Sequence, residues 1–213
     1  MPTEKADTSA PRLTRKGQAT RDRITSAAAA LMFERGVAGT SLEDVQAAAE
    51  VSPSQIYHYF KDKRSLVKAV ISVQTAQVVG AFGAVQPQFG RLDSMEALRA
   101  WRDFAVTLER SLDYAGGCPI GTLGSQLAET DPDARKDVAA GFALWEKSVV
   151  DGLQAMRDRG ELRSDADPKR LGLALLTALQ GGLLLTQIRR DTWALEVTLD
   201  AMLDHVESFV VPV

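Results

Sequence analysis

Residues 51–63 read VSPSQIYHYFKDK and gather hydroxyls, an amide, aromatic rings and cations within one short segment. Serine and glutamine side chains can hydrogen-bond to the edges of bases. Tyrosine, histidine and lysine side chains are donors that suit phosphate oxygens. The combination predicts contact with an anionic partner through hydrogen bonds and charge, without bond-making chemistry. The alternative is a core helix that happens to carry aromatic residues.

Groups that could perform catalysis or hold a metal are few. The chain has one cysteine, Cys118, and two histidines, His58 and His205, which are far apart in sequence. They cannot assemble a typical zinc site. The segment GGCPIG lacks the Lys-Ser/Thr pair that a phosphate-binding P-loop requires. We therefore expect no catalytic residue, no metal and no cofactor. No Lys, Arg or His flanks Cys118 to lower its pKa, which favours a buried thiol over a redox switch.

Composition is typical of a soluble globular protein, and charge is unevenly distributed along the chain. The 213 residues are 45% hydrophobic and 25% charged, with a net charge of -3. Residues 1–68 hold 11 basic and 8 acidic side chains, whereas the remainder holds 14 and 20. A basic end on an acidic body indicates an anionic partner, although chance asymmetry is the alternative. No apolar run suggests a signal peptide or a membrane span, so we expect a cytoplasmic protein with no membrane partner.

Every strong periodic signal in the sequence has helical spacing, which predicts an all-α fold of about nine helices. We expect an N-terminal arm and DNA-binding domain over residues 1–65, with residues 1–11 a polar arm. We expect the rest of the chain, residues 66–213, to form a second helical part. Caps and glycines place the helices at about 14–35, 41–49, 53–60, 62–81, 93–112, 119–129, 131–159, 167–189 and 192–209.

Two of these helices are short and separated by a turn of about three residues. Thr40-Ser41-Leu42-Glu43 and Ser52-Pro53-Ser54-Gln55 both match a capping box, in which a hydroxyl and a later carboxylate or amide satisfy orphan amides. Two brief helices with such a turn have the spacing of a helix-turn-helix. In that motif the second helix lies in the major groove with its N-terminal residues at the base edges.

The segment VSPSQIYHYFKDKRSLV resembles the recognition segment of the TetR family of bacterial repressors. ATRDRITSAAAALMFERGVAGTSLEDVQAAAEVS resembles the family's first two helices, and QGGLLLTQIRRD resembles part of its helical body. GGCPIGTLGSQLAETDP is similar to a subgroup of multidrug-efflux repressors named for lincomycin resistance. Glu50 stands where the family usually has Gly, at a left-handed position that costs about 1 kcal/mol. Gln46 stands where the family usually has Ala, and it can turn outward to DNA.

The motif and the resemblance together imply a palindromic operator on double-stranded DNA as the partner. We expect Gln55, Ser54 and Tyr57 at the major groove, and Thr40, His58 and Lys63 on phosphates. The full predicted DNA-binding set is Thr40, Ser41, Gln46, Ser52, Ser54, Gln55, Tyr57, His58 and Lys63. Core packing of Tyr57 and an idle surface position for His58 are the alternatives.

The resemblance also implies that residues 66–213 are an effector-binding and dimerisation domain with a ligand cavity. By themselves, aromatic residues at helical spacing are more typical of a core, but a cavity needs apolar walls and a few polar anchors. We expect a small apolar or aromatic effector, with glutamines orienting its hydroxyl or carbonyl. The predicted effector-binding residues are Trp101, Phe104, Leu108, Cys118, Gln126, Phe142, Trp145, Gln180 and Gln187.

The last two helices carry apolar faces and small residues that predict a homodimer built as a four-helix bundle. The predicted interface residues are Leu171, Leu175, Ala178, Gly182, Leu185, Leu195, Leu199, Met202 and Val206. The leading function is an effector-released repressor. Two alternatives stay open: a ligand-independent DNA organiser on the same scaffold, which a fully filled body would favour, and an enzyme that turns over a bound compound.

Overall fold

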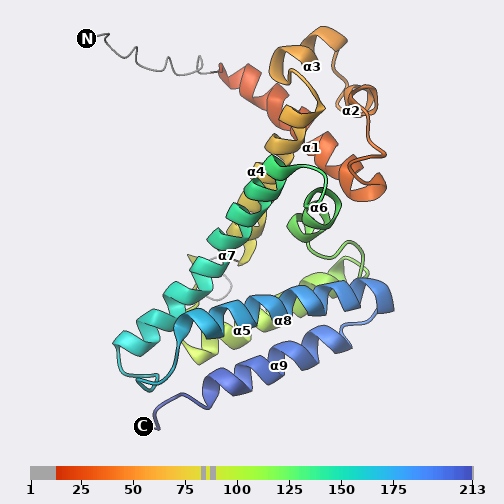
Figure 1. Cartoon of the computed structure of the whole chain (residues 1–213). Coiled ribbons are helices and arrows are strands. Elements are labelled where there is room, and N and C mark those ends of the chain that lie inside the picture. Colours follow the sequence, from red (N-terminus) through yellow and green to blue (C-terminus); the bar gives the residue numbers. More distant parts are fainter. Residues whose placement is uncertain (1–12, 83–84, 87–89, 213) are drawn as a thin grey trace, which may run out of the picture.

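The computed structural model describes residues 13–82, 85–86 and 90–212, and within these ranges the chain forms nine α-helices and one short hairpin (Figure 1). β1 (Val85–Gln86) and β2 (Gly90–Arg91) pair antiparallel and are too short to leave an alternating pattern in the sequence. The all-α prediction is confirmed, and the predicted arm at residues 1–11 lies outside the described residues. The helices are α1 (Arg15–Arg35), α2 (Leu42–Ala48), α3 (Pro53–Tyr59), α4 (Lys63–Phe82), α5 (Met95–Ser111), α6 (Pro119–Leu127), α7 (Pro132–Asp158), α8 (Pro168–Arg189) and α9 (Trp193–Glu207).

Caps read from the sequence begin several of these helices. Asp131 accepts hydrogen bonds from the amides of Asp133 and Ala134, both at 3.0 Å, at the start of α7. Asp167 does the same at the start of α8, and each aspartate is followed by a proline at the first helical position. These side chains satisfy amides that have no partner inside the helix, so the chain's local chemistry sets where the two long helices begin.

The first capping box is displaced by one residue from its predicted position. Ser41, not Thr40, is the N-cap of α2, and Asp44 rather than Glu43 closes the box. The Ser41 Oγ accepts from the Asp44 amide at 3.0 Å. The hydroxyl of Thr40 is already committed, because it donates to the carbonyl of Gly36 at 2.9 Å.

The three N-terminal helices pack around a small core at one end of the molecule (Figure 1). Ile24 and Met32 on α1, Val45 on α2 and Ile56 on α3 are buried, and Phe60 closes the core after α3. Burial of these side chains holds α3 against α1 and leaves the other side of α3 to solvent. The arrangement is a helix-turn-helix supported by a third helix.

Helix α4 belongs to both parts of the chain. It packs on α1 near its start and on α7 and α6 further along, so the predicted boundary near residue 65 falls inside one continuous helix. Arg64 near the start of α4 pairs with Asp131 at 3.3 Å and Asp133 at 2.5 Å, at the start of α7. The DNA-binding end is thereby connected to the body through helices rather than through a loose linker.

Helices α8 and α9 lie side by side at the far end of the body (Figure 1). Leu175, Leu195, Leu199 and Val206 are fully buried between helices of this one chain. A Cβ added at Gly182 would lie 2.7 Å from Leu195 Cδ1, so the small residue brings α8 close to α9 of its own chain. These five predicted dimer residues are therefore corrected: they are buried inside the chain, as Leu171 is, and belong to its internal core. The half-buried Ala178, Leu185 and Met202 keep part of their surface exposed, and their place at a dimer interface stays a prediction.

Helix α8 is long and apolar enough, by length and composition alone, to cross a membrane. It packs against α7 as well as α9, and its buried leucines belong to the core of the body. A core helix of a soluble protein passes the same test of length and composition. Leu173, Leu184 and Ile188 of α8 are not part of this core, because they are exposed on the surface of the chain.

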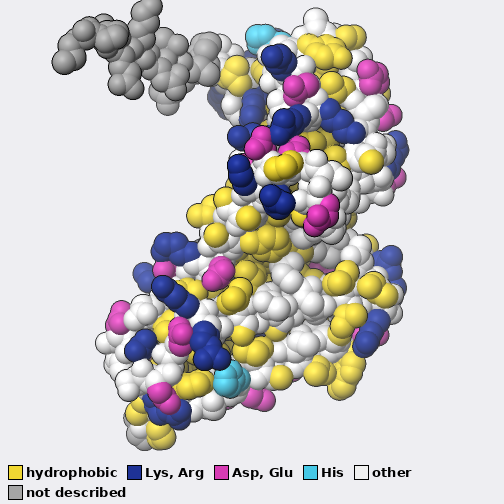
Figure 2. Space-filling view, in the orientation of Figure 1, with side chains coloured by type: hydrophobic (Ala, Val, Ile, Leu, Met, Phe, Trp, Pro, Cys, Tyr) yellow, Lys and Arg dark blue, Asp and Glu magenta, His cyan; other side chains and the backbone are white. Residues whose placement is uncertain are grey.

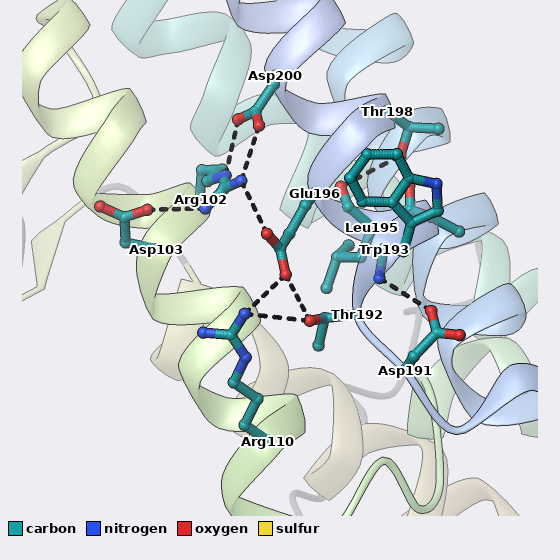
Figure 3. A network of polar contacts seen from close by, with 11 residues as sticks. Arg102, Asp103, Arg110, Asp191, Thr192, Trp193, Leu195, Glu196, Thr198 and Asp200 are labelled. Atoms are coloured by element: carbon teal, nitrogen blue, oxygen red, sulfur yellow. Dashed lines mark hydrogen bonds and ion pairs between the residues drawn. The ribbon is translucent and has the colours of Figure 1, made fainter.

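A polar network joins α5 to α9 (Figure 3). Arg102 makes two parallel bonds of 2.8 Å to the carboxylate of Asp200. About two turns further along α5, Arg110 donates to Glu196 at 2.8 Å, and Glu196 also accepts from Thr192. A bidentate arginine–carboxylate pair fixes orientation as well as distance. The network therefore determines which face of α5 turns toward α9 and which turns toward the interior.

Candidate DNA-binding surface and body cavity

The outer face of α3 is exposed and polar. Tyr57 has 56% of its surface exposed, and Ser52, Ser54, Gln55 and His58 are exposed around it. Such exposure is incompatible with a core role for Tyr57, so the reading of residues 51–63 as a simple core helix does not hold for this face. The tyrosine and histidine project from the helix toward solvent, where a partner could meet them.

The residues predicted to read bases also hold the start of α3 in shape. The backbone N–H of Gln55 donates to Ser52 Oγ at 3.3 Å, and the side-chain oxygen of Gln55, Oε1, accepts from the backbone N–H of Ser52 at 2.8 Å. A bidentate pair with adenine needs both the oxygen and the nitrogen of a glutamine. The oxygen already accepts one bond at the helix cap and has one lone pair left, whereas the Nε2 donor is fully available and suits a base acceptor such as a purine N7.

The surroundings of Thr40 do not support its predicted contact with a DNA phosphate. Its side chain is 1% exposed and its hydroxyl donates to Gly36. We correct its role to stabilising the turn between α1 and α2. Ser41 is half-buried, and its hydroxyl donates to Asp44 Oδ2 at 2.6 Å, which lowers the pKa of the Asp44 carboxyl. Both hydroxyls are thus used within the protein.

Cations near α3 differ in whether acidic side chains neutralise them. Lys63, the first residue of α4, is half-buried and forms no ion pair with any described residue. Arg64 and Lys68 on the same helix are paired with acidic residues of α7 or its N-cap. Figure 2 shows Lys and Arg side chains exposed over the α1–α4 end of the molecule, with acidic side chains among them. Lys63 is therefore free to meet a phosphate, whereas Arg64 is not.

The turn between α2 and α3 has the strained backbone predicted from the sequence. Glu50 has φ of 51°, in the left-handed region that glycine occupies without steric cost. The neighbouring Gln46 is half-buried on α2, and an outward reach to DNA stays a prediction.

A cavity of about 360 Å³ lies in the body where α1, α4, α5, α6, α7 and α8 meet. Its walls are mainly apolar, with polar side chains such as Gln74 and Gln77 from α4. Three predicted effector residues line it: Leu108 from α5, Cys118 at the start of α6, and Trp145 from α7. A mainly apolar hollow of this size with a few polar groups has the properties of a small-molecule site.

The other predicted aromatic residues belong to the packing behind the cavity. Trp101 is fully buried in the core. Phe142 lies parallel to Trp145 with ring centroids 6.5 Å apart, and Phe104 is half-buried against the same core. None of the three is among the described residues that line the cavity, although Phe142 contacts the wall residue Trp145, so their direct contact with an effector stays a prediction that this structure does not support.

The three predicted glutamine anchors occupy different places. Gln126 does not line the cavity: its Oε1 accepts from the Val37 amide, between α6 and the end of α1. Gln180 lies against Gly121 of α6, next to the Cys118 cap, and Gln187 lies against Gly117 of the cavity wall. Gln180 and Gln187 thus lie beside the wall, whereas Gln126 is corrected to a contact with the DNA-binding part.

Cys118 has the properties expected of a structural thiol. It is the N-cap of α6, and its Sγ accepts from the Gly121 amide at 3.4 Å. Burial raises the pKa of the Cys118 thiol, with a smaller contribution from nearby Glu109. The sulfur therefore stays protonated at neutral pH, which lowers its reactivity.

Glu109 is an acidic cavity residue that the sequence analysis missed, as it missed Gln74 and Gln77. It lines the cavity on α5 and is only 4% exposed, and burial raises the pKa of its carboxyl. The sequence carried a signal: Glu109 follows Ala105 by four positions and precedes Leu112 by three, so it lies on the apolar stripe of the helix. A carboxyl on such a stripe faces the interior.

Known proteins share both parts of this architecture. Residues 24–70 match the family described as bacterial regulatory proteins, tetR family, and residues 94–202 match the tetracyclin repressor-like C-terminal domain. The chain therefore belongs to the tetR family of regulators and is a DNA-binding transcriptional regulator. The family and the relatives are regulators, which confirms the prediction that the chain is not an enzyme. Membership of the lincomycin-resistance subgroup stays a prediction.

Relatives extend over nearly the whole chain. An uncharacterized HTH-type transcriptional regulator in the lacX 3′ region of Lactococcus lactis subsp. lactis is 27% identical, covering 89% of this chain and 94% of the relative. The HTH-type transcriptional repressor DhaR of Mycobacterium sp. (strain GP1) is 24% identical over 84% and 89%. The crystal structure of a TetR transcriptional regulator from Chloroflexus aurantiacus J-10-FL superposes with a TM-score of 0.78 at 27% identity, covering 92% and 98%.

Proposed function

We propose that this protein represses transcription by binding a palindromic operator as a homodimer, and that a small, mainly apolar effector releases it. The observation that carries the proposal is one helix, α4, with Lys63 beside α3 at its start and Gln74 and Gln77 in the cavity wall further along. Operator DNA would place the protein in the cytoplasm. A fully filled body would have favoured a ligand-independent DNA organiser, and the cavity argues against that alternative.

The proposed dimer uses the exposed faces of α8 and α9. Leu173, Leu184 and Ile188 recur on one face of α8 with 52%, 55% and 67% of their surfaces exposed. Trp193 and Val197 continue this apolar surface onto α9, where Trp193 is 67% exposed. Contiguous exposed apolar side chains mark interaction surfaces, and a twofold axis through this face would form a four-helix bundle.

Release would follow from movement of α4 and α6. Both helices contribute to the cavity wall and both contact the DNA-binding part, α4 through α1 and α6 through Gln126. An effector that spreads the wall would shift the two α3 helices of the dimer. Their separation must match one turn of DNA, about 34–36 Å, for both to enter successive major grooves.

Operator selection tests the proposal directly. The purified full chain is incubated with a randomised duplex library, and retained duplexes are sequenced after several rounds. We expect enrichment of a palindrome, and loss of its binding when a library of lipophilic compounds is added. Retention of duplexes without any shared sequence would instead support the DNA-organiser alternative.

Effector linkage provides a second check. If a compound weakens operator binding by some factor, operator must weaken compound binding by the same factor. Titration of the compound, followed by tryptophan fluorescence with and without operator, measures how operator changes the affinity for the compound. That factor is compared with the factor by which the compound weakens operator binding. An affinity that operator leaves unchanged, for a compound shown to occupy the cavity, would exclude that compound as the inducer.

A further inference from the structure

Glu109 has a buried oxygen without a hydrogen-bond partner. Its Oε2 is inaccessible to solvent and meets no donor from any described residue. A buried polar atom left without a partner costs free energy, and a buried charge costs more. If this position served only packing, an apolar side chain would fill it without the free-energy cost of burying an unpartnered carboxyl oxygen. The wall position of Glu109 therefore points to a donor that arrives with a ligand.

The rest of the cavity wall supplies no positive charge. None of the residues that line the cavity is a lysine, arginine or histidine. The adjacent Arg110 is held away by Glu196 and Thr192 on α9. A carboxylate at Glu109 would thus lack a counter-charge until a cation enters the cavity.

The carboxyl is held where it is by the helix that carries it. Arg102 and Arg110 bind α5 to α9 at two points, as Figure 3 shows. These contacts keep Glu109 turned inward and prevent α5 from rotating it toward water. The rings of Phe33 and Trp145 also line the cavity, and aromatic faces attract organic cations.

We propose that Glu109 anchors the effector, and that the effector is a lipophilic amine or ammonium compound whose cationic nitrogen pairs with the Glu109 carboxylate. The apolar walls and aromatic rings would enclose its hydrocarbon part. This proposal rests on the proposed effector site and names the ligand's chemical class. It replaces the sequence-based expectation that glutamines orient a hydroxyl or carbonyl.

Matched probes test the charge requirement. We would measure binding of 4-phenylbutylamine and its neutral counterpart 4-phenylbutanol to the full-length protein by calorimetry at pH 7.5. A charge-assisted hydrogen bond predicts at least about tenfold tighter binding of the amine. In Glu109→Gln, which preserves shape, the preference should fall to about onefold.

Two further variants make the result decisive. Glu96→Gln removes an exposed glutamate from the same helix and should keep the amine preference. Ala81→Trp fills the cavity and should abolish binding of both probes. Equal binding of amine and alcohol to the native protein, or an amine preference that survives in Glu109→Gln, would overturn the proposal. If neither probe binds the native protein, the proposed effector site fails as well, so the two failures are distinguishable.

The pH dependence of a permanently charged probe provides an independent readout. Burial raises the pKa of Glu109, so the carboxyl takes up a proton as pH falls and the pairing is lost. Affinity for benzyltrimethylammonium should therefore fall with decreasing pH in the native protein but not in Glu109→Gln. Cys118 is the other titratable group in the wall, since α1, α4, α7 and α8 contribute none there. It remains neutral over this range because burial raises its pKa. A pH dependence retained in Glu109→Gln would contradict the assignment.

Discussion

Gln126 and Val37 stand 89 positions apart in sequence, yet Gln126 Oε1 accepts a hydrogen bond from the Val37 amide at 2.7 Å. Gln126 lies on α6, whose start forms part of the cavity wall, and Val37 follows α1 in the DNA-binding part. This single side chain therefore connects the helix beside the cavity to the helix that supports α3. It is a direct contact through which occupation of the cavity could alter DNA binding.

Gln126→Ala should weaken this coupling while leaving the cavity intact. A hydrogen bond contributes about 1 kcal/mol, so the factor by which effector weakens operator binding should fall by about fivefold. Effector affinity without DNA should not change. Fluorescence anisotropy with labelled operator measures both quantities. Ser125→Ala, at an exposed neighbour on α6, is the control, and an equal loss of coupling in that variant would contradict the specific role of Gln126.

Glu50→Gly should stabilise the protein. Relief of a left-handed non-glycine residue is worth about 1 kcal/mol, which corresponds to a melting temperature about 2–4 °C higher for a chain of this size. Glu50→Ala removes the same charge but keeps the Cβ, so it should show no such gain. Differential scanning calorimetry compares the three proteins. Equal stabilisation by Ala and Gly would assign the effect to charge instead of backbone strain.

Lys63→Ala should weaken binding to all DNA sequences alike, because a phosphate contact carries no sequence information. The slope of log affinity against log salt should decrease in magnitude by about 1. Lys68→Ala is the matched control, since Lys68 pairs with Asp137 on α7 at 3.9 Å. A Lys63 variant that loses affinity for operator but keeps its affinity for random duplex would not fit a phosphate contact.

Gln55 can be tested by separating its two roles. Gln55→Glu keeps the oxygen that caps α3 but removes the Nε2 donor, whereas Gln55→Ala removes both. Both variants should lose preference at one base pair, by about 1–3 kcal/mol, and only the alanine variant should lose stability. Competition between operator and single-base variants measures the preference and thermal melting measures the stability. Unchanged preference in Gln55→Glu would show that Nε2 reads no base.

Ile188→Asp should dissociate the proposed dimer, because it places a charge within the exposed apolar face of α8 and α9. Leu144→Asp provides the control, since Leu144 is an exposed leucine on α7, 56% exposed, outside that face. Sedimentation velocity at micromolar concentration should give a monomer for the first variant and a dimer for the native chain and the control. A native monomer, or dimers in both variants, would require another interface.

Much of the secondary structure of this protein could be predicted from its sequence, because it depends on interactions between residues close together in the chain. Helical periodicity and the aspartate–proline starts at Asp131 and Asp167 specify helices through contacts within a few residues. The short helices around Ser52 identify the helix-turn-helix for the same reason, and Glu50 adopts the left-handed conformation that its turn requires. Each of these features depends on neighbours in sequence, so no knowledge of distant packing was needed.

Tertiary structure decided which partners those helices meet. An apolar stripe shows that a face is covered but not what covers it, so Leu175 and Leu195 were assigned to a partner chain although α8 and α9 bury them together. Gln126 and Gln180 look alike in sequence, yet Gln126 accepts a hydrogen bond from the Val37 amide and Gln180 lies against Gly121 of α6. Glu109 became a candidate anchor only when six helices placed it in a cavity wall with one carboxyl oxygen lacking a donor. Burial and hydrogen bonding between residues far apart in the chain depend on how whole helices pack, and helical spacing alone does not encode that arrangement.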